Sequence, residues 1–265
     1  MNIVDRLSVS VVPLEIFSNT DKSLAKATGF FYADGEEIYL VSNWHVLSGR
    51  NPQTGQPHHN SGAIPHSLSF PLMRKKNHLN DSTNHTVLLV NKQDENLWLQ
   101  DRGYGQRVDV AVLKLDINLS DFANECTNLN NNANDLDISA GIDVFVLGYP
   151  LNQSKQRNIP VWKKASIASE PYYPLDDHYE GFLIDCSTRE GMSGAPVIAR
   201  QFGFYLRQDG EVSLKPGIHS RFLGIYSGRY TGNDLAEMQL GIVWKEEHIQ
   251  NIISDGVNGN IELLK

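Results

Sequence analysis

The sequence predicts an all-β protein, and three observations indicate this fold class. Short runs rich in β-branched and aromatic residues recur along the chain, and turn-forming segments separate them. These runs do not alternate with amphipathic helical patterns, as the strands of an α/β protein would. A helical pattern is found only near the C-terminus. The predicted strand segments are 6–17, 27–46, 86–90, 97–100, 109–115, 143–150, 181–186, 195–200, 222–230 and 238–244.

The segment 27–46 is long enough for two strands joined by a hairpin. Its turn lies around 33–36, where Asp34 is followed by Gly35. An Asp-Gly pair between apolar runs is a strong hairpin signal, because the turn needs residues that accept a positive φ.

Two polar segments interrupt the strand pattern and are expected to be loops. Residues 48–80 hold most of one long insertion and contain four prolines. Residues 120–137 include an asparagine-rich run that we expect not to pack. Because this second segment lies near the middle of the chain, it suits a linker between two lobes.

One amphipathic helix is predicted after the last strand. Ile249, Ile252 and Ile253 have the i, i+3, i+4 spacing of a single helix face, and Gly256 is a suitable stop. We expect this helix to pack on the body of the protein.

Charge and composition argue against several classes of partner. The net charge is −8, which opposes binding to nucleic acid. No stretch approaches the roughly 20 apolar residues of a membrane helix, and the N-terminus lacks the pattern of a secretory signal. The two cysteines, Cys126 and Cys186, fit free thiols in a reducing compartment better than a disulfide. These observations predict a cytoplasmic protein with no nucleic-acid and no membrane partner.

The segment 190–196, EGMSGAP, places Ser193 between Gly191 and Gly194 with only Met192 intervening. The glycines could serve a simple turn with positive φ. Alternatively, they could bend the backbone so that a serine hydroxyl and nearby N–H groups point at one spot. A serine hydroxyl is a poor nucleophile until a base removes its proton, so the second interpretation requires a histidine elsewhere.

His45 and Asp109 are the candidate partners of this serine. His45 ends an apolar run and so lies at the edge of a core, although a histidine there could also be structural. Asp109 starts an apolar strand, where a buried charge needs a partner, which could be a histidine or the nearby Arg107.

The remaining histidines offer no competing metal centre. His58, His59 and His66 lie in the polar insertion, and their spacing matches no structural zinc site. We expect them to belong to a solvated loop, and we expect no metal and no organic cofactor.

Three segments resemble the signatures of chymotrypsin-like (trypsin-like) serine peptidases of bacterial type, in the same chain order. They are SNWHV around His45, DVAVLKL from Asp109 and GMSGAPV around Ser193. Two further segments, VFVLGYP and FLGIYSGRY, are similar to strands of the same family. The resemblance covers about residues 8–253.

The resemblance implies a fold of two six-stranded antiparallel β-barrels with a short C-terminal helix. The chain would be a single peptidase domain over 1–265, with lobes at about 1–130 and 136–245 and a helix and tail at 246–265. It also implies a catalytic triad of His45, Asp109 and Ser193, in which the imidazole moves the proton and the carboxylate orients it. The N–H groups of Gly191 and Ser193 would form the oxyanion hole.

Departures from the family pattern bear on activation, specificity and substrate access. Met192 replaces the aspartate that pairs with a newly released N-terminus in animal digestive members, so we expect activity without N-terminal cleavage. Ser187 stands at the base of the expected specificity pocket, where no carboxylate would meet a Lys or Arg. The insertion 48–80 follows His45 and could recognise substrate or merely decorate the surface. The expected substrate pocket consists of Ser187, Thr188, Tyr226, Ser227, Gly228 and Arg229.

Several functions remain open at this point. The leading one is a serine endopeptidase that acts on a protein or peptide, prefers small or apolar residues, and could be controlled by a regulatory partner. Thr188 and Arg229 would instead favour an acidic residue at the cleaved bond. A catalytically silent peptide-binding module on the same fold and a partner-activated effector protease are the alternatives. An α/β-hydrolase esterase is disfavoured because the tetrad at 191–194 lacks the G-x-S-x-G elbow.

Overall fold

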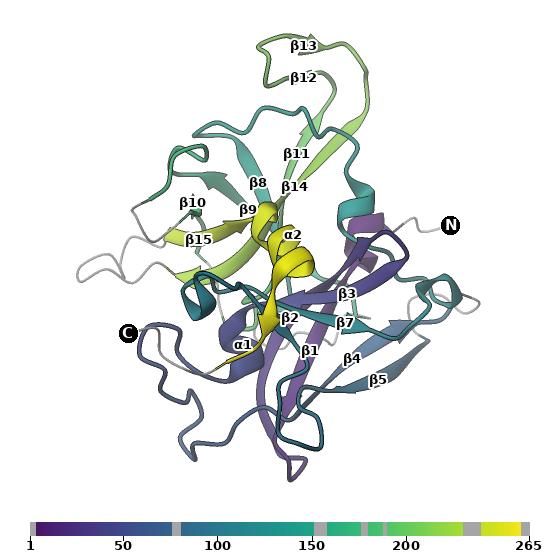
Figure 1. Ribbon diagram of the computed structural model, residues 1–265. Coiled ribbons are helices and arrows are strands. Elements are labelled where there is room, and N and C mark those ends of the chain that lie inside the picture. The colour runs from purple at the N-terminus through teal and green to yellow at the C-terminus, as the bar shows by residue number, and fades with distance from the viewer. Residues whose placement is uncertain are drawn as a thin grey trace.

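The computed structural model describes residues 4–75, 81–150, 158–175, 180–187, 190–229 and 240–260, and within them the chain is mostly β-structure (Figure 1). The strands of the first lobe are β1 (Val11–Phe17), β2 (Ser23–Asp34), β3 (Glu37–Ser42), β4 (Ser67–Met73), β5 (Ser82–Leu88), β6 (Leu99–Gln100), β7 (Ala111–Leu115) and the C-terminal β16 (Val257–Asn258). The second lobe holds β8 (Asp143–Gly148), β9 (Val161–Ile167), β10 (Phe182–Asp185), β11 (Pro196–Phe202), β12 (Tyr205–Leu206), β13 (Val212–Ser213), β14 (Ile218–Arg229) and β15 (Leu240–Lys245). The α-helices are α1 (Trp44–Ser48) and α2 (Glu246–Asp255), and short 3-10 turns include η1 (Arg6–Val9) and η5 (Asn128–Asn130).

The predicted fold class is confirmed: two antiparallel β-lobes are followed by a short C-terminal helix. The second lobe is a closed six-stranded barrel in the order β10-β15-β14-β11-β8-β9. In the first lobe the described strands form an eight-stranded sheet in the order β16-β6-β7-β3-β2-β1-β4-β5. The last strand, β16, pairs with β6 and so covers an edge that would otherwise present unpaired backbone groups.

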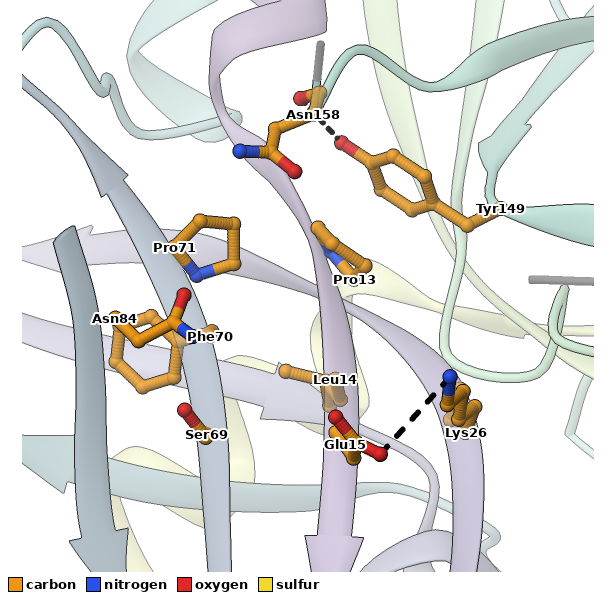
Figure 2. Close-up of a pocket in the computed structure, with 11 residues that line it drawn as sticks. Pro13, Leu14, Glu15, Lys26, Ser69, Phe70, Pro71, Asn84, Tyr149 and Asn158 are labelled. Carbon is orange, nitrogen blue, oxygen red and sulfur yellow. Dashed lines mark hydrogen bonds and ion pairs between the residues drawn. The ribbon is translucent and has the colours of Figure 1, made fainter. Parts of the chain in front are cut away.

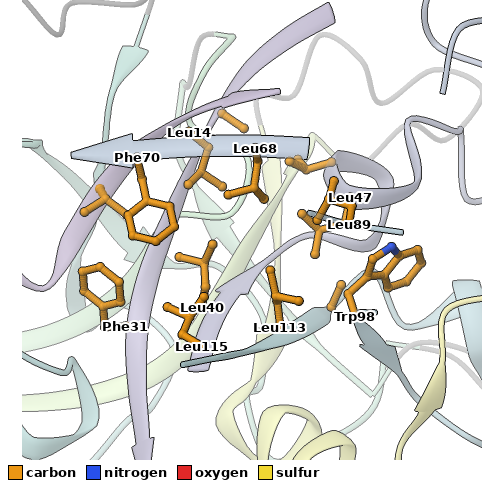
Figure 3. Close-up of a cluster of buried hydrophobic side chains, with 14 of the residues drawn as sticks. Leu14, Phe31, Leu40, Leu47, Leu68, Phe70, Leu89, Trp98, Leu113 and Leu115 are labelled. Atoms are coloured by element: carbon orange, nitrogen blue, oxygen red, sulfur yellow. The ribbon is translucent and has the colours of Figure 1, made fainter. Parts of the chain in front are cut away.

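Each lobe has its own apolar core, and a third cluster joins the two lobes. Figure 3 shows the core of the first lobe, where Phe31 and Phe70 meet edge to face at 5.6 Å. The joining cluster includes Phe30 from β2, Phe222 from β14 and Ile249 from α2. Since fully burying such a side chain contributes about 1.5–3 kcal/mol, this cluster fixes how the lobes meet.

Two local predictions are confirmed. The hairpin between β2 and β3 turns at Gly35, which has a φ of +58°. The predicted C-terminal helix is α2, and its residues Ile249 and Ile252 are fully buried in the joining cluster. Figure 1 shows α2 lying between the two lobes.

The prediction that 48–80 is one long loop is wrong in its second half. Residues 67–73 form β4, which pairs with β1 and β5 and buries Leu68 and Phe70 in the first core. Pro71 argues against a strand at the level of sequence, because proline cannot donate a backbone hydrogen bond. It is tolerated because the pairing of β4 with β1 ends at Ser69, so no ladder bond to β1 is lost there.

The prediction that the asparagine-rich segment does not pack is also wrong. Its asparagine side chains form hydrogen bonds with backbone N–H and C=O groups of strands in both lobes. Asn128 bonds to the N–H and the C=O of Ala33 in β2, at 3.0 and 2.8 Å. Asn132 accepts from the N–H of Ser220 at 2.7 Å and donates to the C=O of Ile218 at 2.8 Å, both in β14. The linker thus joins the lobes through these hydrogen bonds and also through buried apolar side chains, Cys126 in the first core and Ala133 and Leu136 in the second.

The α-helices within the described residues are short. Helix α1 has five residues and α2 has ten, and neither has the length and apolar character needed to span a membrane. The sequence analysis did not predict α1, which is a single turn enforced by tertiary contacts.

Candidate active site

Helix α1 is anchored by a buried tryptophan, and this anchor places the neighbouring His45. Trp44 is fully buried, and its indole N–H donates to Gln100 Oε1 at 2.8 Å. Its ring also meets Trp98 edge to face at 6.3 Å. Because Trp44 holds one side of the turn in the core, His45 is fixed at the border between core and solvent.

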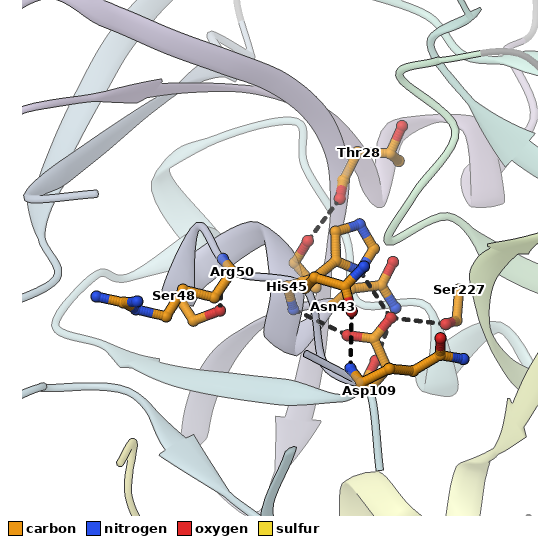
Figure 4. Close-up of polar contacts among 10 residues, drawn as sticks. Thr28, Asn43, His45, Ser48, Arg50, Asp109 and Ser227 are labelled. Carbon is orange, nitrogen blue, oxygen red and sulfur yellow. Dashed lines mark hydrogen bonds and ion pairs between the residues drawn. The ribbon is translucent and has the colours of Figure 1, made fainter. Parts of the chain in front are cut away.

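Asp109 accepts hydrogen bonds from three groups and is almost completely buried (Figure 4). Its Oδ1 accepts from the backbone N–H of His45 at 2.8 Å, and its Oδ2 lies 2.7 Å from His45 Nδ1. Ser227, from the barrel, donates its hydroxyl to the same Oδ2 at 2.6 Å. An ionised carboxylate can only accept, so Nδ1 carries the proton and Nε2 is the free basic nitrogen.

This arrangement decides between the two partners considered for Asp109. Arg107 is exposed, whereas the carboxylate of Asp109 is engaged by the imidazole and the backbone of His45. Asn43 also fixes the backbone of Asp109, since its side-chain N–H donates to the backbone C=O of Asp109 at 2.8 Å.

The contacts with Asp109 set the basicity of His45. Burial lowers the pKa of His45, but the negative charge of Asp109 and its hydrogen bond raise it, and the net pKa lies above the usual 6.5. Such an imidazole is a better proton acceptor than a free histidine, provided that the pH keeps it neutral.

The loop of Ser193 is held against the first lobe through Thr28 of β2. The Thr28 hydroxyl donates to the C=O of Gly191 at 2.6 Å, and the Thr28 N–H donates to the C=O of Ser193 at 2.9 Å. Both glycines have a positive φ, +93° for Gly191 and +85° for Gly194. At Gly194 a Cβ would collide with the Thr28 carbonyl and with Ser42 Oγ. A simple turn requires only the positive φ and not the missing Cβ, so Gly194 also allows the close approach of the two lobes.

Two backbone donors at this loop are uncommitted. Among the described residues, the N–H groups of Gly191 and Ser193 have no hydrogen-bond acceptor. The sequence analysis assigned these two groups to an oxyanion hole, which requires them to be free.

One cleft contains Ser193, Gly191 and His45 together. It has a volume of about 510 Å³ and lies on the side of the first lobe. The lining residues are Ile16, Leu24, Ala25, Lys26, Ala27, His45, Val46, Gly49, His58, His59, Asn60, Ala63, Pro65, Glu190, Gly191 and Ser193.

The first half of the insertion therefore forms a wall of the cleft, which favours a role in recognition over mere decoration. His58 lies edge to face against His45, with 5.8 Å between ring centroids. Burial and the nearby His45 lower the pKa of His58. His58 is consequently a neutral hydrogen-bonding group near pH 7 rather than a second cation in the cleft.

The predicted specificity pocket is only partly described. Ser187 is exposed at the end of β10, and Tyr226 is buried in the barrel core, where its ring lies against Gly241. Ser227 contacts Asp109, and Gly228 has a φ of +103°. Thr188 lies outside the described residues, and for Arg229 the structure describes only the backbone, in β14.

Three residues of the site were not predicted from the sequence or were predicted in another role. Ser227 was placed in the pocket wall, whereas the structure has it holding Asp109. Thr28 carries no local signal, because its role depends on a loop 163 residues away. His58 was predicted to belong to a solvated loop, whereas it lines the cleft beside His45.

Another hollow, between β1, β4 and the start of the β8–β9 connection, has no comparable chemistry (Figure 2). Its volume is about 170 Å³. Glu15 and Lys26 approach each other at 3.9 Å there, and Tyr149 donates its hydroxyl to the C=O of Asn158 at 2.7 Å. Across the described ranges, no group of three or more His, Cys, Asp and Glu side chains is placed to hold a metal ion.

Comparisons with known proteins bear on the family and the fold of the chain. A family model described as the trypsin-like peptidase domain matches residues 27–204, which include His45, Asp109 and Ser193. A comparison with curated protein sequences gives no significant match.

Solved structures share the fold. The HtrA-type protease AlgW with a tripeptide is 15% identical with a TM-score of 0.52, over 94% of this chain and 60% of AlgW. A thermostable serine protease, AL20, from an extremophilic microorganism is 12% identical with a TM-score of 0.53, over 94% of this chain and 97% of AL20. The chain thus spans about 60% of the length of the HtrA-type structure.

The close approach at Gly194 predicts a large effect of Gly194→Ala. The added methyl group has to displace Thr28 and Ser42, which adds about 1–3 kcal/mol of overpacking to the strain of a left-handed backbone. Gly141→Ala is the matched control, because Gly141 has a φ of +88° and open space around its Cβ position. Urea denaturation should show that Gly194→Ala loses at least about 1 kcal/mol more free energy of unfolding than the control. Equal losses would show that the lobes do not meet as tightly as described.

Proposed function

Because the chain belongs to the trypsin-like peptidase family, we propose that it is a serine endopeptidase that hydrolyses peptide bonds through an acyl-enzyme intermediate. The observation that carries the proposal is that His45, which is hydrogen-bonded to the buried Asp109, lines the same cleft as Ser193. A catalytically silent module would not need a buried carboxylate that orients an imidazole toward the cleft.

The proposed reaction begins with attack of Ser193 Oγ on the carbonyl carbon of the substrate. His45 Nε2 takes the hydroxyl proton, and the carbonyl oxygen becomes an oxyanion that the N–H groups of Gly191 and Ser193 stabilise. Collapse of this intermediate breaks the C–N bond, and His45 returns the proton to the leaving amine. Water then attacks the acyl ester with His45 again as the base, which releases the acid and restores Ser193.

Asp109 has two tasks in this proposal. Its hydrogen bond holds the imidazole in the tautomer that leaves Nε2 free, and its charge stabilises the imidazolium that forms in each step. Ser227 and the backbone N–H of His45 also donate to the carboxylate, which fixes its direction.

The substrate preference follows from the absence of an acid at the expected pocket base. Ser187 offers no carboxylate to a buried cation, so we propose that the enzyme does not select Lys or Arg at the cleaved bond. The cytoplasmic location, the bacterial type and a regulatory protein partner stay predictions.

Covalent labelling tests the proposed nucleophile. A fluorophosphonate probe should label the intact, uncleaved chain at Ser193, because the probe reacts only with a serine that has an activated hydroxyl. Ser193→Ala should abolish labelling, whereas Ser166→Ala, in β9 of the same barrel, should leave it unchanged. Peptide mapping by mass spectrometry identifies the labelled residue. A folded chain that takes up no label would favour the silent peptide-binding module instead.

The pH dependence of kcat/KM tests the role of Asp109. Since neutral His45 is the base, kcat/KM should be low where His45 is protonated and should increase as the pH rises through the pKa of His45, which lies above 6.5. Asp109→Asn removes the negative charge that counteracts the effect of burial on the pKa of His45, so this pKa should move below 6.5. The same variant should lower kcat by about 10⁴. NMR titration of the His45 ring gives the pKa even where the variant is too slow to assay. An unchanged pKa would rule out Asp109 as the group that sets it.

Cleavage profiling with a peptide library tests the proposed preference. Products should show few Lys or Arg residues at the new C-termini, because a cation would be desolvated without a partner. Ser187→Asp supplies the missing carboxylate and should raise cleavage after Lys or Arg about tenfold, the effect of one charged hydrogen bond. Dominant cleavage after Lys or Arg by the unchanged chain would contradict the pocket assignment.

A further inference from the structure

A two-stranded ribbon extends from the barrel at the end remote from the candidate active site. Strands β12 and β13 pair antiparallel and continue the hairpin of β11 and β14 (Figure 1, top). The ribbon lies outside both apolar cores apart from Tyr205, which is buried in the barrel core.

Large apolar side chains on this ribbon are exposed to solvent to an unusual extent. Their exposed fractions lie between 44% and 75%. The residues, named here the apolar ladder, are Phe202, Phe204, Leu206, Val212, Leu214 and Ile218.

The apolar ladder occupies one face of the ribbon. Tyr205 and His219 contact each other on the opposite, inner face, with ring centroids 4.5 Å apart. Because successive side chains of a strand alternate, Leu206 in β12 and Ile218 in β14 point outward. Their register partners Val212 and Phe202 lie on the same face. Phe204 and Leu214 lie just outside the strands, next to Tyr205 and Ser213, and both are exposed.

The ladder consists of cross-strand pairs. Phe202 is in register with Ile218, and Leu206 is in register with Val212. Tyr205 pairs with Ser213, and the exposed Phe204 and Leu214 directly adjoin that pair in the chain.

The outer face continues an interface that the protein already uses. Closer to the candidate active site, the same face of β11 and β14 carries Ile198 and Phe222, which are buried against the first lobe. The two side chains are in register, as Phe202 and Ile218 are four positions further along. Arg200 and Ser220 form the pair between them on this face, and the Arg200 guanidinium is paired with Asp5 and lies 5.7 Å over the Phe202 ring. The face thus has a covered apolar pair, a polar pair and then an exposed apolar pair.

The charges around the ladder argue for a protein partner and against a membrane. Arg207 is held by Asp135, Asp209 and Glu211 at 2.9, 2.7 and 3.4 Å. At the turn of the ribbon these carboxylates outnumber Arg207, which opposes an anionic lipid surface there. The ladder itself holds no charged residue, so the side chains that would meet between two copies of this chain are apolar.

The area of the ladder suits self-association. An aromatic side chain buries about 150–250 Å² when covered, and the aliphatic members of the ladder are somewhat smaller. With the exposed fractions given above, the exposed parts of the ladder amount to roughly 600 Å² per copy. Monomeric proteins rarely leave more than this in one patch, and two such faces together reach about 1,200 Å², the lower limit of specific interfaces.

We propose that the apolar ladder is a dimerisation surface on which two copies of this chain stack the outer faces of their ribbons about a two-fold axis. Such an interface is self-complementary, so each ladder covers the other. Strand β11 has seven residues and separates the ladder from the loop of Ser193 by about 20 Å, so the dimer leaves the cleft open.

Sedimentation equilibrium between about 1 and 100 μM tests the proposal, since weak specific interfaces associate in this range. The full chain should be dimeric at the upper concentrations. The double variant Phe204→Asp/Leu214→Asp should be monomeric throughout, because four carboxylates would face one another across the axis. Leu88→Asp, which places one carboxylate on an exposed apolar position of β5, should remain dimeric. All three should take up the fluorophosphonate probe equally, which shows that they are folded.

A second measurement does not depend on the charged variant. Phe204→Cys should give a covalent dimer with a short bismaleimide, while the buried Cys126 and Cys186 should not react. A chain that is monomeric at 100 μM, a dimer that persists in the double variant, or a monomer that sediments with phosphatidylcholine or phosphatidylserine vesicles would each overturn the proposal.

Discussion

The buried carboxylate of Asp109 is the group on which the candidate site depends. A charge that is 4% exposed needs strong hydrogen-bond partners, and Asp109 finds them in both lobes. The backbone and the ring of His45 come from the first lobe, and the hydroxyl of Ser227 comes from the barrel. The same three contacts therefore satisfy the charge, orient the imidazole and fix the distance between the lobes.

A second set of contacts makes the nucleophile loop depend on the first lobe. Thr28 bonds through its hydroxyl to Gly191 and through its N–H to Ser193, so the loop cannot adopt its bend without β2 beside it. In this bend the N–H groups of Gly191 and Ser193 have no acceptor within the part of the chain that the structure describes, as the proposed oxyanion hole requires. Each half of the proposed chemistry is thus completed by the opposite lobe, which explains why the joining apolar cluster is as well buried as either core.

The sequence predicted what local pattern specifies and missed what depends on distant partners. His45, Asp109 and Ser193 each lie in a distinctive local segment, and their order identified the fold. Thr28 looks like any strand threonine, because its partner lies 163 residues later. The asparagines of 128–132 resemble a disordered linker in composition, since nothing local shows the unpaired strand backbone that they satisfy. Pro71 is a local breaker signal that tertiary context overrode, because β4 no longer pairs with β1 there.

One alternation along β11 and β14 explains both the joint between the lobes and the apolar ladder. Ile198 and Phe222 are covered by the first lobe, the next outward pair is Arg200 with Ser220, and the pair after that is the exposed Phe202 with Ile218. A strand pair that only closed a barrel would stay polar on its outer face from Arg200 onward, as antiparallel sheets do where they meet water. The return to apolar side chains beyond Arg200 has no benefit for the fold itself, since exposed apolar surface promotes non-specific association. The extension is therefore best understood as a surface built for a partner, on a strand whose other end carries the nucleophile.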